Sequence, residues 1–344
     1  MIRYTTGNLL EASTEALVNT VNCVGVMGKG IALQFKQAYP KCFSEYQKAC
    51  KMNEVRPGKM HVVNLDSLFN PKYIINFPTK RHWKEKSNIE DIKAGLIDLI
   101  NVIKQQNIKS IAIPPLGCGN GGLNWAEVRP IILAAMEQVP DTEVLLFEPN
   151  NAPSPDKMKI GTTKPNMTKT RALFISLMNQ YKLPGYRLSL LEIQKLAYFL
   201  QEVGEPMRLN FEKGKYGPYA EVLNHVLQRL EGHYIRGYGD RSNKAEVYLL
   251  ENASEEAKKV LINEPEALKK LEMVNELIYG FETPYGLELL STVHWVVKQD
   301  PKFLENKELV VTEVHNWNEH KKQRLQPNHI LKAVEHINEI FSYK

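Results

Sequence analysis

The stretch that decides the fold reads Asn19-Thr20-Val21-Asn22-Cys23-Val24-Gly25-Val26-Met27-Gly28-Lys29-Gly30-Ile31-Ala32. Three glycines fall within six residues, after a predicted strand (Ala16 to Val21) and before a helix that we expect to begin near Gly30. Glycine lets backbone N–H groups approach a phosphate closely, and the start of a helix adds positive potential. A tight turn between a strand and a helix needs the same glycines, so this loop alone leaves both interpretations open.

A second glycine-rich loop follows the predicted strand Ile108–Ile113 and has the sequence Pro114-Pro115-Leu116-Gly117-Cys118-Gly119-Asn120-Gly121-Gly122-Leu123-Asn124-Trp125. Strands of a parallel sheet end at one edge, so this loop is a second candidate anion site at the edge that carries the first. Two such loops would suit a diphosphate bound from both sides. Neither loop has the P-loop pattern, and the first has the dinucleotide fingerprint in reverse order, so a P-loop NTPase and a Rossmann dehydrogenase are both disfavoured.

The first half of the chain alternates predicted strands with amphipathic helical stretches. Some strands are apolar on successive residues, as in Val144 to Phe147, which is typical of strands covered on both faces. One helix follows Ser87, which forms a plausible capping box with Glu90, and another starts at Asn124. This alternation predicts an α/β domain of three layers, with strands at Ala16–Val21, Met60–Leu65, Tyr73–Phe77, Ile108–Ile113 and Thr142–Phe147.

The chain changes character after a polar segment that is rich in proline. We place the boundary near residue 155 and predict domains at 1–155 and 171–344, joined by a linker at 156–170. The second domain is expected to be mainly helical, because apolar residues recur at helical spacing. We predict a capping box at Ser189 and Glu192 and the end of that helix at Gly204. Further helices are predicted at 219–230, 255–279 and 327–341, with short strands around 234–238 and 246–250.

Composition narrows the class of protein. The 344 residues fit two domains, and 44 Lys and Arg against 39 Asp and Glu give a formal net charge of +5. That mild value neither requires nor excludes a nucleic-acid partner. The four cysteines lack metal-ligand spacing and are too few for a disulfide scaffold, so we expect no metal and a reducing compartment. The N-terminal residues show no signal-peptide pattern, so we expect a cytoplasmic protein.

The third segment of interest, Asn76-Phe77-Pro78-Thr79-Lys80-Arg81-His82-Trp83, contains a lysine just after a predicted strand. A lysine on a loop is usually a surface charge. Here, however, the predicted strand Tyr73–Phe77 brings Lys80 to the sheet edge that carries both glycine loops. Beside a pocket it becomes a candidate nucleophile, with a pKa that burial or a cationic neighbour such as Arg81 would lower.

Four motifs of the first half resemble the macrodomain family: Thr6-Gly-Asn-Leu-Leu10, the stretch from Asn22 to Gln34, Phe77-Pro-Thr-Lys80 and Pro115-Leu-Gly-Cys-Gly119. Within it, the chain resembles the DNA ADP-ribosyl glycohydrolases called DarG. The second half also looks like them, at Leu191-Glu-Ile-Gln-Lys-Leu-Ala-Tyr198 and Lys215-Tyr-Gly-Pro-Tyr219. The resemblance covers nearly the whole chain. It implies a three-layer α/β/α macrodomain with a mixed sheet and an ADP-ribose cleft over the C-terminal edge.

The resemblance also implies a role for each matched residue. Lys80 corresponds to the family's catalytic lysine, which would attack or polarise the anomeric carbon of the distal ribose. No cofactor and no metal are implied. The implied ligand-binding residues are Asn8 and Leu9 near the adenine; Gly30, Ile31, Ala32, Leu33, Gln34, Gly117, Cys118, Gly119, Asn120 and Gly121 at the diphosphate; and Thr20, Asn22 and Thr79 on the distal-ribose side, with Val21 among them.

Two positions depart from the family pattern. Many macrodomains have aspartate where this chain has Asn8, and the amide oxygen of Asn8 can still accept a hydrogen bond from adenine. Related lysine-dependent macrodomains have aspartate where this chain has Gly121, so the resemblance assigns no residue as the acid or base. Glu11 and Glu15 are carboxylates near the first glycine loop in sequence, although an ordinary surface role is the simpler interpretation.

The activity implied by the resemblance is hydrolysis of the bond between ADP-ribose and a DNA base, with thymidine as the expected base. ADP-ribosylated DNA would be the substrate and ADP-ribose would be the product. The reaction would reverse the DNA modification made by the toxin DarT. The second domain would bind and neutralise that toxin. Two alternatives remain, a non-catalytic reader of ADP-ribose and a hydrolase of ADP-ribosylated protein, each with the second domain as an interaction module. Lys80 favours an enzyme, whereas the cleft motifs do not separate DNA from protein.

Local charge differs along the second half. Residues 245–320 contain 7 Lys and Arg against 15 Asp and Glu, a net charge of −8. A toxin that modifies single-stranded DNA needs a basic channel, so an acidic helical surface would suit it as a DNA mimic. A solvated acidic face is the alternative. Residues 157–215 are basic and would steer DNA toward the cleft, or serve only solubility.

Overall fold

The computed structural model describes residues 1–149, 153–154, 157–181, 185–239, 245–300, 303 and 306–342. The chain divides into two compact units, one built mainly from Met1–Thr163 and the other beginning at Lys164. Residue 155, near which the sequence predicts the boundary, lies outside the described residues. The segment after it packs on the first unit, because Met158 is buried and Gly161 N donates to Gln37 O at 2.8 Å.

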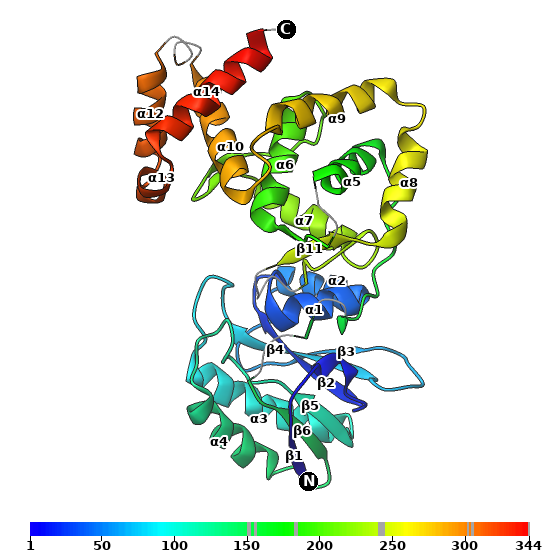
Figure 1. The fold of residues 1–344 in the computed structure, drawn as a ribbon. Coiled ribbons are helices and arrows are strands. Elements are labelled where there is room, and N and C mark those ends of the chain that lie inside the picture. The colour runs from blue at the N-terminus through cyan, green and yellow to red at the C-terminus, as the bar shows by residue number, and fades with distance from the viewer. Residues whose placement is uncertain are drawn as a thin grey trace. The chain divides into compact units, whose positions relative to one another are not determined.

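A six-stranded mixed sheet forms the centre of the first unit (Figure 1). Its order is β1-β6-β5-β2-β4-β3, and every pairing is parallel except that of β3 with β4. The mixed sheet is therefore confirmed. The strands are β1 (Ile2–Thr5), β2 (Ala16–Asn22), β3 (His61–Asn64), β4 (Tyr73–Lys80), β5 (Ser110–Ile113) and β6 (Glu143–Phe147).

Helices cover both faces of this sheet, as Figure 1 shows. Val18 and Phe77 pack on one face with the apolar sides of α3 (Ile89–Gln105) and α4 (Trp125–Met136). Leu17 and Ile74 pack on the other face with α1 (Gly30–Ala38) and α2 (Pro40–Lys51). Because side chains alternate along a strand, neighbouring apolar residues serve opposite faces. The three-layer architecture predicted from strand–helix alternation is confirmed.

The capping box predicted at Ser87 and Glu90 is wrong. Asn88 caps α3, since its side chain accepts a hydrogen bond from Glu90 N at 3.0 Å. Ser87 instead donates its backbone N–H to Gly121 O at 3.0 Å, and its hydroxyl is buried without a partner among the described residues. The tertiary contact with the second glycine loop thus decides which residue caps the helix. The cap predicted at Asn124 is confirmed by its bond with Ala126 N at 3.1 Å.

The second unit is mainly helical, as predicted. The capping box at Ser189 is present, and Gly204 follows the helix with a φ of +92°. The predicted helix 255–279 is two helices, because Pro265 starts a new one. The helices are α5 (Lys169–Tyr181), α6 (Leu190–Glu202), α7 (Glu221–Leu230), α8 (Glu251–Leu261), α9 (Pro265–Ile278), α10 (Pro284–Gln299), α12 (Lys307–Asn316), α13 (Glu319–Arg324) and α14 (Pro327–Ser342).

Short strands complete this unit. The strands expected around 234–238 and 246–250 are β10 (Ile235–Arg236) and β11 (Glu246–Leu249), which pair antiparallel, and β11 also pairs with β7 (Leu188–Ser189). A separate hairpin joins β8 (Glu212–Gly214) to β9 (Gly217–Tyr219). Both sequence motifs of the second half meet at this hairpin, because the buried ammonium of Lys195 donates to Pro218 O at 2.6 Å.

Candidate active site

Lys80 lies where the fold brings three segments together. It is the last residue of β4, and β4 pairs along its length with β2, which leads into the first glycine loop. The register shifts after Val21, so that Asn22 pairs with Lys80. Cys23 N then donates to Arg81 O at 3.2 Å. The first glycine loop therefore leaves the sheet directly beside Lys80.

The second glycine loop reaches the same point. The ammonium of Lys80 donates to Asn120 O at 2.5 Å. A Cβ on Gly30 would lie 2.9 Å from Asn120 Nδ2, so the first and second loops also approach each other closely. Gly30 has a φ of +59°, which glycine adopts readily, and it begins α1. The structure thus gathers Lys80, Gly30 and Asn120, as the sequence predicts.

Burial lowers the pKa of Lys80 below its usual value. Removal from water disfavours the charged ammonium, so more of the neutral amine is present at a given pH. Arg81 is not the cause, although the sequence suggested it. Its guanidinium makes a two-point contact with Asp91, at 3.0 and 3.3 Å, which neutralises its charge locally. The fold therefore supplies a lysine that is easier to deprotonate than a surface lysine.

Asn22 organises the first glycine loop from within. Its side chain accepts hydrogen bonds from Val24 N at 3.0 Å and Val26 N at 3.3 Å, and donates to Val26 O at 2.5 Å. The Tyr46 hydroxyl donates to Asn22 O at 2.6 Å. The sequence left two roles open, a bond to a sugar hydroxyl and orientation of the loop. The contacts of the buried side chain support orientation of the loop.

The second glycine loop needs glycine at two positions for different reasons. Gly117 has a φ of +70°, in the left-handed region. A Cβ on Gly121 would lie 2.2 Å from Gly117 O and 2.3 Å from Ser87 Oγ, which leaves no room for a side chain. Around Gly119, by contrast, a Cβ would meet nothing within 4 Å. The aspartate that related macrodomains have in place of Gly121 does not fit this backbone.

The other predicted site residues differ in how far their side chains are exposed to solvent. Asn8 is half-buried and caps the short helix Leu9–Glu11, since it accepts from Leu10 N at 3.1 Å and its amide also contacts Lys157 O at 3.4 Å. Thr20, Ile31, Ala32, Cys118, Gly119 and Asn120 are half-buried or exposed, whereas Leu9, Val21, Leu33, Gln34 and Thr79 are buried. Burial also raises the pKa of the Cys118 thiol to about 11, which makes it a poor nucleophile.

Known proteins share the part of the chain that forms this site. The Macro domain family matches residues 18–132, the part of the chain that holds both glycine loops and Lys80. A "DNA ADP-ribosyl glycohydrolase" of Thermus aquaticus is 49% identical over 300 residues, which are 87% of this chain and 83% of that protein. This chain belongs to the DNA ADP-ribosyl glycohydrolase family, called DarG. The match includes the second unit as well as the macrodomain.

Two further relatives match a smaller part of the chain. The solved macrodomain of Mycobacterium tuberculosis DarG is 59% identical, with a TM-score of 0.43, and covers 44% of this chain and 99% of that chain. A "DNA ADP-ribosyl transferase-DNA ADP-ribosyl glycohydrolase fusion protein" of Thermosipho africanus is 34% identical over 165 residues, covering 44% of this chain and 42% of that protein. The name of that relative gives two activities to one polypeptide, a DNA ADP-ribosyl transferase and a DNA ADP-ribosyl glycohydrolase.

The carboxylates near the first glycine loop in sequence are engaged elsewhere. Glu15 precedes β2, at the opposite edge of the sheet from Lys80, where it pairs with Lys72 at 2.9 Å and accepts from Lys109 N at 2.7 Å. These contacts hold the pKa of Glu15 below its usual value. Glu11 accepts from Asn8 Nδ2 at 3.1 Å. The geometry of this DarG macrodomain therefore supports a structural role for both residues.

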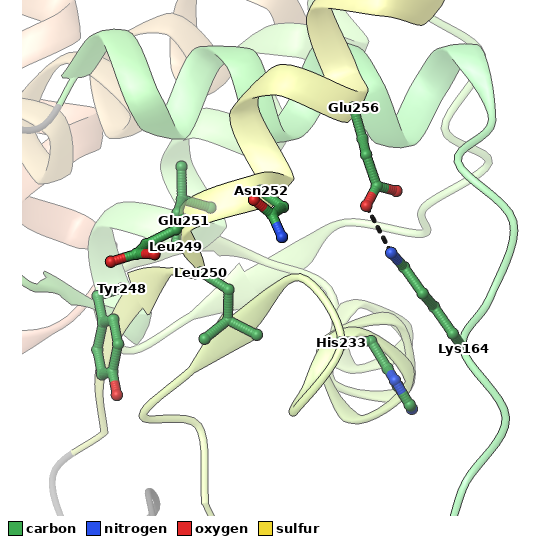
Figure 2. A pocket seen from close by; sticks show the side chains of 8 residues that line it. All are labelled: Lys164, His233, Tyr248, Leu249, Leu250, Glu251, Asn252 and Glu256. Atoms are coloured by element: carbon green, nitrogen blue, oxygen red, sulfur yellow. Dashed lines mark hydrogen bonds and ion pairs between the residues drawn. The ribbon is translucent and has the colours of Figure 1, made fainter.

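The second unit of this DarG chain has a pocket of its own, shown in Figure 2. Lys164 points toward Glu256 across it, with the two charged groups 2.5 Å apart, and His233 and Tyr248 also line it.

Within the described part of the chain, no group of three or more His, Cys, Asp or Glu side chains is placed to hold a metal ion. No described helix has both the length and the apolar content needed to cross a membrane.

The glycine loop gives a direct test of the described backbone. Gly121→Ala should lower the free energy of unfolding by about 1–3 kcal/mol, because the new methyl group collides with Gly117 O and Ser87 Oγ. Gly119→Ala, two residues away, should change it by less than about 0.5 kcal/mol. Denaturant unfolding of the two full-length variants, followed by tryptophan fluorescence, measures both. Equal stabilities would contradict this description of the loop.

Proposed function

We propose that this chain hydrolyses the glycosidic bond between ADP-ribose and a DNA base, with Lys80 as the catalytic residue. The observation that carries the proposal is the position of Lys80, whose ammonium reaches Asn120 in one glycine loop while its strand pairs with the start of the other. The names of the relatives support DNA as the carrier of the ADP-ribose. Thymidine remains the expected base.

The two loops and α1 are suited to the diphosphate of ADP-ribose. The first backbone N–H groups of a helix have no partner within the helix, and the helix dipole favours negative charge there. α1 offers such groups from Gly30 onward, and Gly119 and Asn120 are exposed on the facing loop. Binding of the diphosphate would hold the distal ribose against Lys80. Remote binding energy of this kind positions the reacting bond.

The chemical step needs a nucleophile or a polarising group at the anomeric carbon. In the proposed route the neutral amine of Lys80 bonds to that carbon, and the electron pair of the breaking bond leaves with the base, which takes up a proton. Water then adds to the carbon, the bond to Lys80 breaks and ADP-ribose is released. A lowered pKa favours this route, because only the unprotonated amine has an electron pair to share. Polarisation by the ammonium without a covalent bond is the alternative.

Replacing Lys80 tests the proposal. Lys80→Ala should slow release of ADP-ribose from modified DNA by at least about 100-fold, because it removes the reacting amine. Its affinity for free ADP-ribose should stay within about fivefold, since both loops remain. The wild-type rate should rise with pH and level off below pH 10.5, the usual pKa of lysine, as the amine loses its proton. Lys93→Ala, an exposed lysine on α3, is the matched control.

The same assay separates the alternative functions. Purified full-length protein is incubated with ADP-ribosylated DNA and, in parallel, with ADP-ribosylated protein. Release from DNA alone supports the proposal, whereas release from protein alone supports the rival hydrolase. Binding of ADP-ribose without release from either substrate supports a reader. A wild-type rate of Lys80→Ala on DNA would show that Lys80 is not the nucleophile.

We also propose that the second unit binds and neutralises the toxin that modifies DNA. One relative carries both the transferase and the glycohydrolase name, which supports a functional link between the two activities. The net charge of −8 over residues 245–320 suits a basic DNA channel. α9 contributes Glu266 and Glu272 to its exposed surface. The ion pair of Glu266 with Lys269 is solvent-exposed and therefore weak, so it leaves most of the acidic character in place.

The structure supports a DNA-steering role of the basic segment 157–215 less well than the sequence does. Lys164 pairs with Glu256 and Lys169 pairs with Glu264, while Lys195 is buried. Lys195 is withdrawn from solvent, and the exposed pairs of Lys164 and Lys169 offset their charge only in part, as they also offset that of Glu256 and Glu264. The segment therefore presents less positive charge than its sequence suggests.

Charge reversal on α9 and at Glu264, the residue before it, tests toxin binding. Replacing Glu264, Glu266 and Glu272 with lysine should weaken toxin affinity at least about tenfold and flatten its salt dependence, because like charges would then face each other. A matched triple reversal on the macrodomain, at Glu54, Glu90 and Glu137, should leave the affinity within about twofold. Titration calorimetry at several salt concentrations measures both. Unchanged affinity and salt dependence in the α9 variant would contradict the mimicry.

A further inference from the structure

The segment that follows Lys80 has an exposed tryptophan beside the site. Residues Arg81–Lys86, the post-lysine loop, connect β4 to α3 and include Trp83, Lys84 and Lys86. Trp83 is 49% exposed, which is high for so large an apolar side chain. We propose that Trp83, with Lys84 and Lys86, binds the nucleotide adjacent to the ADP-ribosylated one in single-stranded DNA. This inference rests on the proposed function, because it assigns a DNA-binding subsite to the same enzyme.

The post-lysine loop is fixed at both ends to the two glycine loops. At its start, Arg81 O accepts from Cys23 N at 3.2 Å, and at its end the next residue, Ser87, donates its N–H to Gly121 O at 3.0 Å. A turn inside it is closed by Glu85 N donating to His82 O at 3.1 Å. Because both ends are anchored on the loops of the candidate site, Trp83 keeps a defined place next to it.

The distance from Lys80 suits a neighbouring nucleotide. Trp83 lies three positions after Lys80 in the sequence, so their Cα atoms lie at most about 11 Å apart. Stacked nucleotides rise about 3.4 Å each along one strand, so the span corresponds to no more than about three nucleotides. A strand whose modified base lies at Lys80 would therefore bring an adjacent base within reach of the indole.

The side chains of the loop have the chemistry that single-stranded DNA needs. The His82 and Trp83 rings lie 5.5 Å apart at 32°, and the Lys84 ammonium is 5.0 Å from the centre of the indole. Lys84 and Lys86 are exposed, and neither forms an ion pair within the part of the chain that the structure describes. Aromatic side chains stack on bases, and unpaired lysines attract phosphates. An ADP-ribosylated protein would have no base to place on Trp83.

The test compares two substrates that carry the same modification. One is a toxin-modified oligonucleotide, and the other is the ADP-ribosylated nucleoside released from it by digestion. Trp83→Ala should lower kcat/KM for the oligonucleotide roughly 5- to 100-fold through KM, because a base–aromatic stack is lost. Hydrolysis of the nucleoside should stay within about twofold, and Trp83→Phe should recover much of the loss. Phe69→Ala, an 81% exposed aromatic in the loop between β3 and β4, is the matched control.

The contribution of Lys84 and Lys86 is measured separately, through the salt dependence of the KM for the oligonucleotide. Changing Lys84 and Lys86 to glutamine should reduce the salt dependence of oligonucleotide KM by about 1.4 in log–log slope, at about 0.7 for each phosphate contact on a single strand. An equal loss on both substrates in Trp83→Ala, or no loss on either, would overturn the proposal. If the wild-type protein hydrolyses neither substrate, the proposed function itself fails. If it hydrolyses both and Trp83→Ala has no effect, only the subsite fails.

Discussion

The hydrogen bond from Lys80 to the carbonyl of Asn120 joins the end of β4 to the second glycine loop, and it places the reactive amine between the two loops of the site. It forms because β2, β4 and β5 run parallel, so their carboxyl ends reach one edge of the sheet. The first glycine loop, the second glycine loop and the lysine then meet over that edge. The same crowding partly removes the ammonium from water, which lowers the pKa of Lys80.

Buried polar side chains hold a loop or hairpin in place in each unit. In the first, the amide of Asn22 satisfies the backbone of the glycine loop from Val24 to Val26. In the second, the ammonium of Lys195 satisfies Pro218 in the β8–β9 hairpin, and burial lowers the pKa of this lysine to about 7. A buried polar group without a partner is costly, so each contact favours a single conformation of its loop.

The sequence predicted much of the fold because the relevant signals are local. Apolar runs mark β2, β4, β5 and β6, and glycines mark the loops that follow β2 and β5. Lys80 was also singled out, because it closely follows the predicted strand Tyr73–Phe77 and matches the family motif Phe77-Pro-Thr-Lys80. The strand β4 itself continues to Lys80. β1 was not predicted, because it is an edge strand in which Arg3 and Tyr4 are exposed and its pattern is weakly apolar.

Other parts of the site depend on contacts between distant residues, which the sequence does not show. Ser87 and Asn88 both suit a helix cap, and the bond of Ser87 to Gly121 decides between them. Asn8 suits a ligand contact, yet its side chain caps the helix that follows. The exposed Trp83 carried no signal of its own in the sequence, because a tryptophan is usually buried and its exposure is a tertiary property.

The central claim is that Lys80 forms a bond to the distal ribose during turnover. A lysine bonded to the anomeric carbon can open to an imine, which sodium cyanoborohydride reduces to a stable amine. Turnover of ADP-ribosylated DNA with this reductant, followed by mass spectrometry of peptides, should therefore find ADP-ribose on Lys80, and no adduct at that position in Lys80→Arg. Continued turnover with no adduct on Lys80, or equal labelling of exposed lysines such as Lys84 and Lys86, would contradict it.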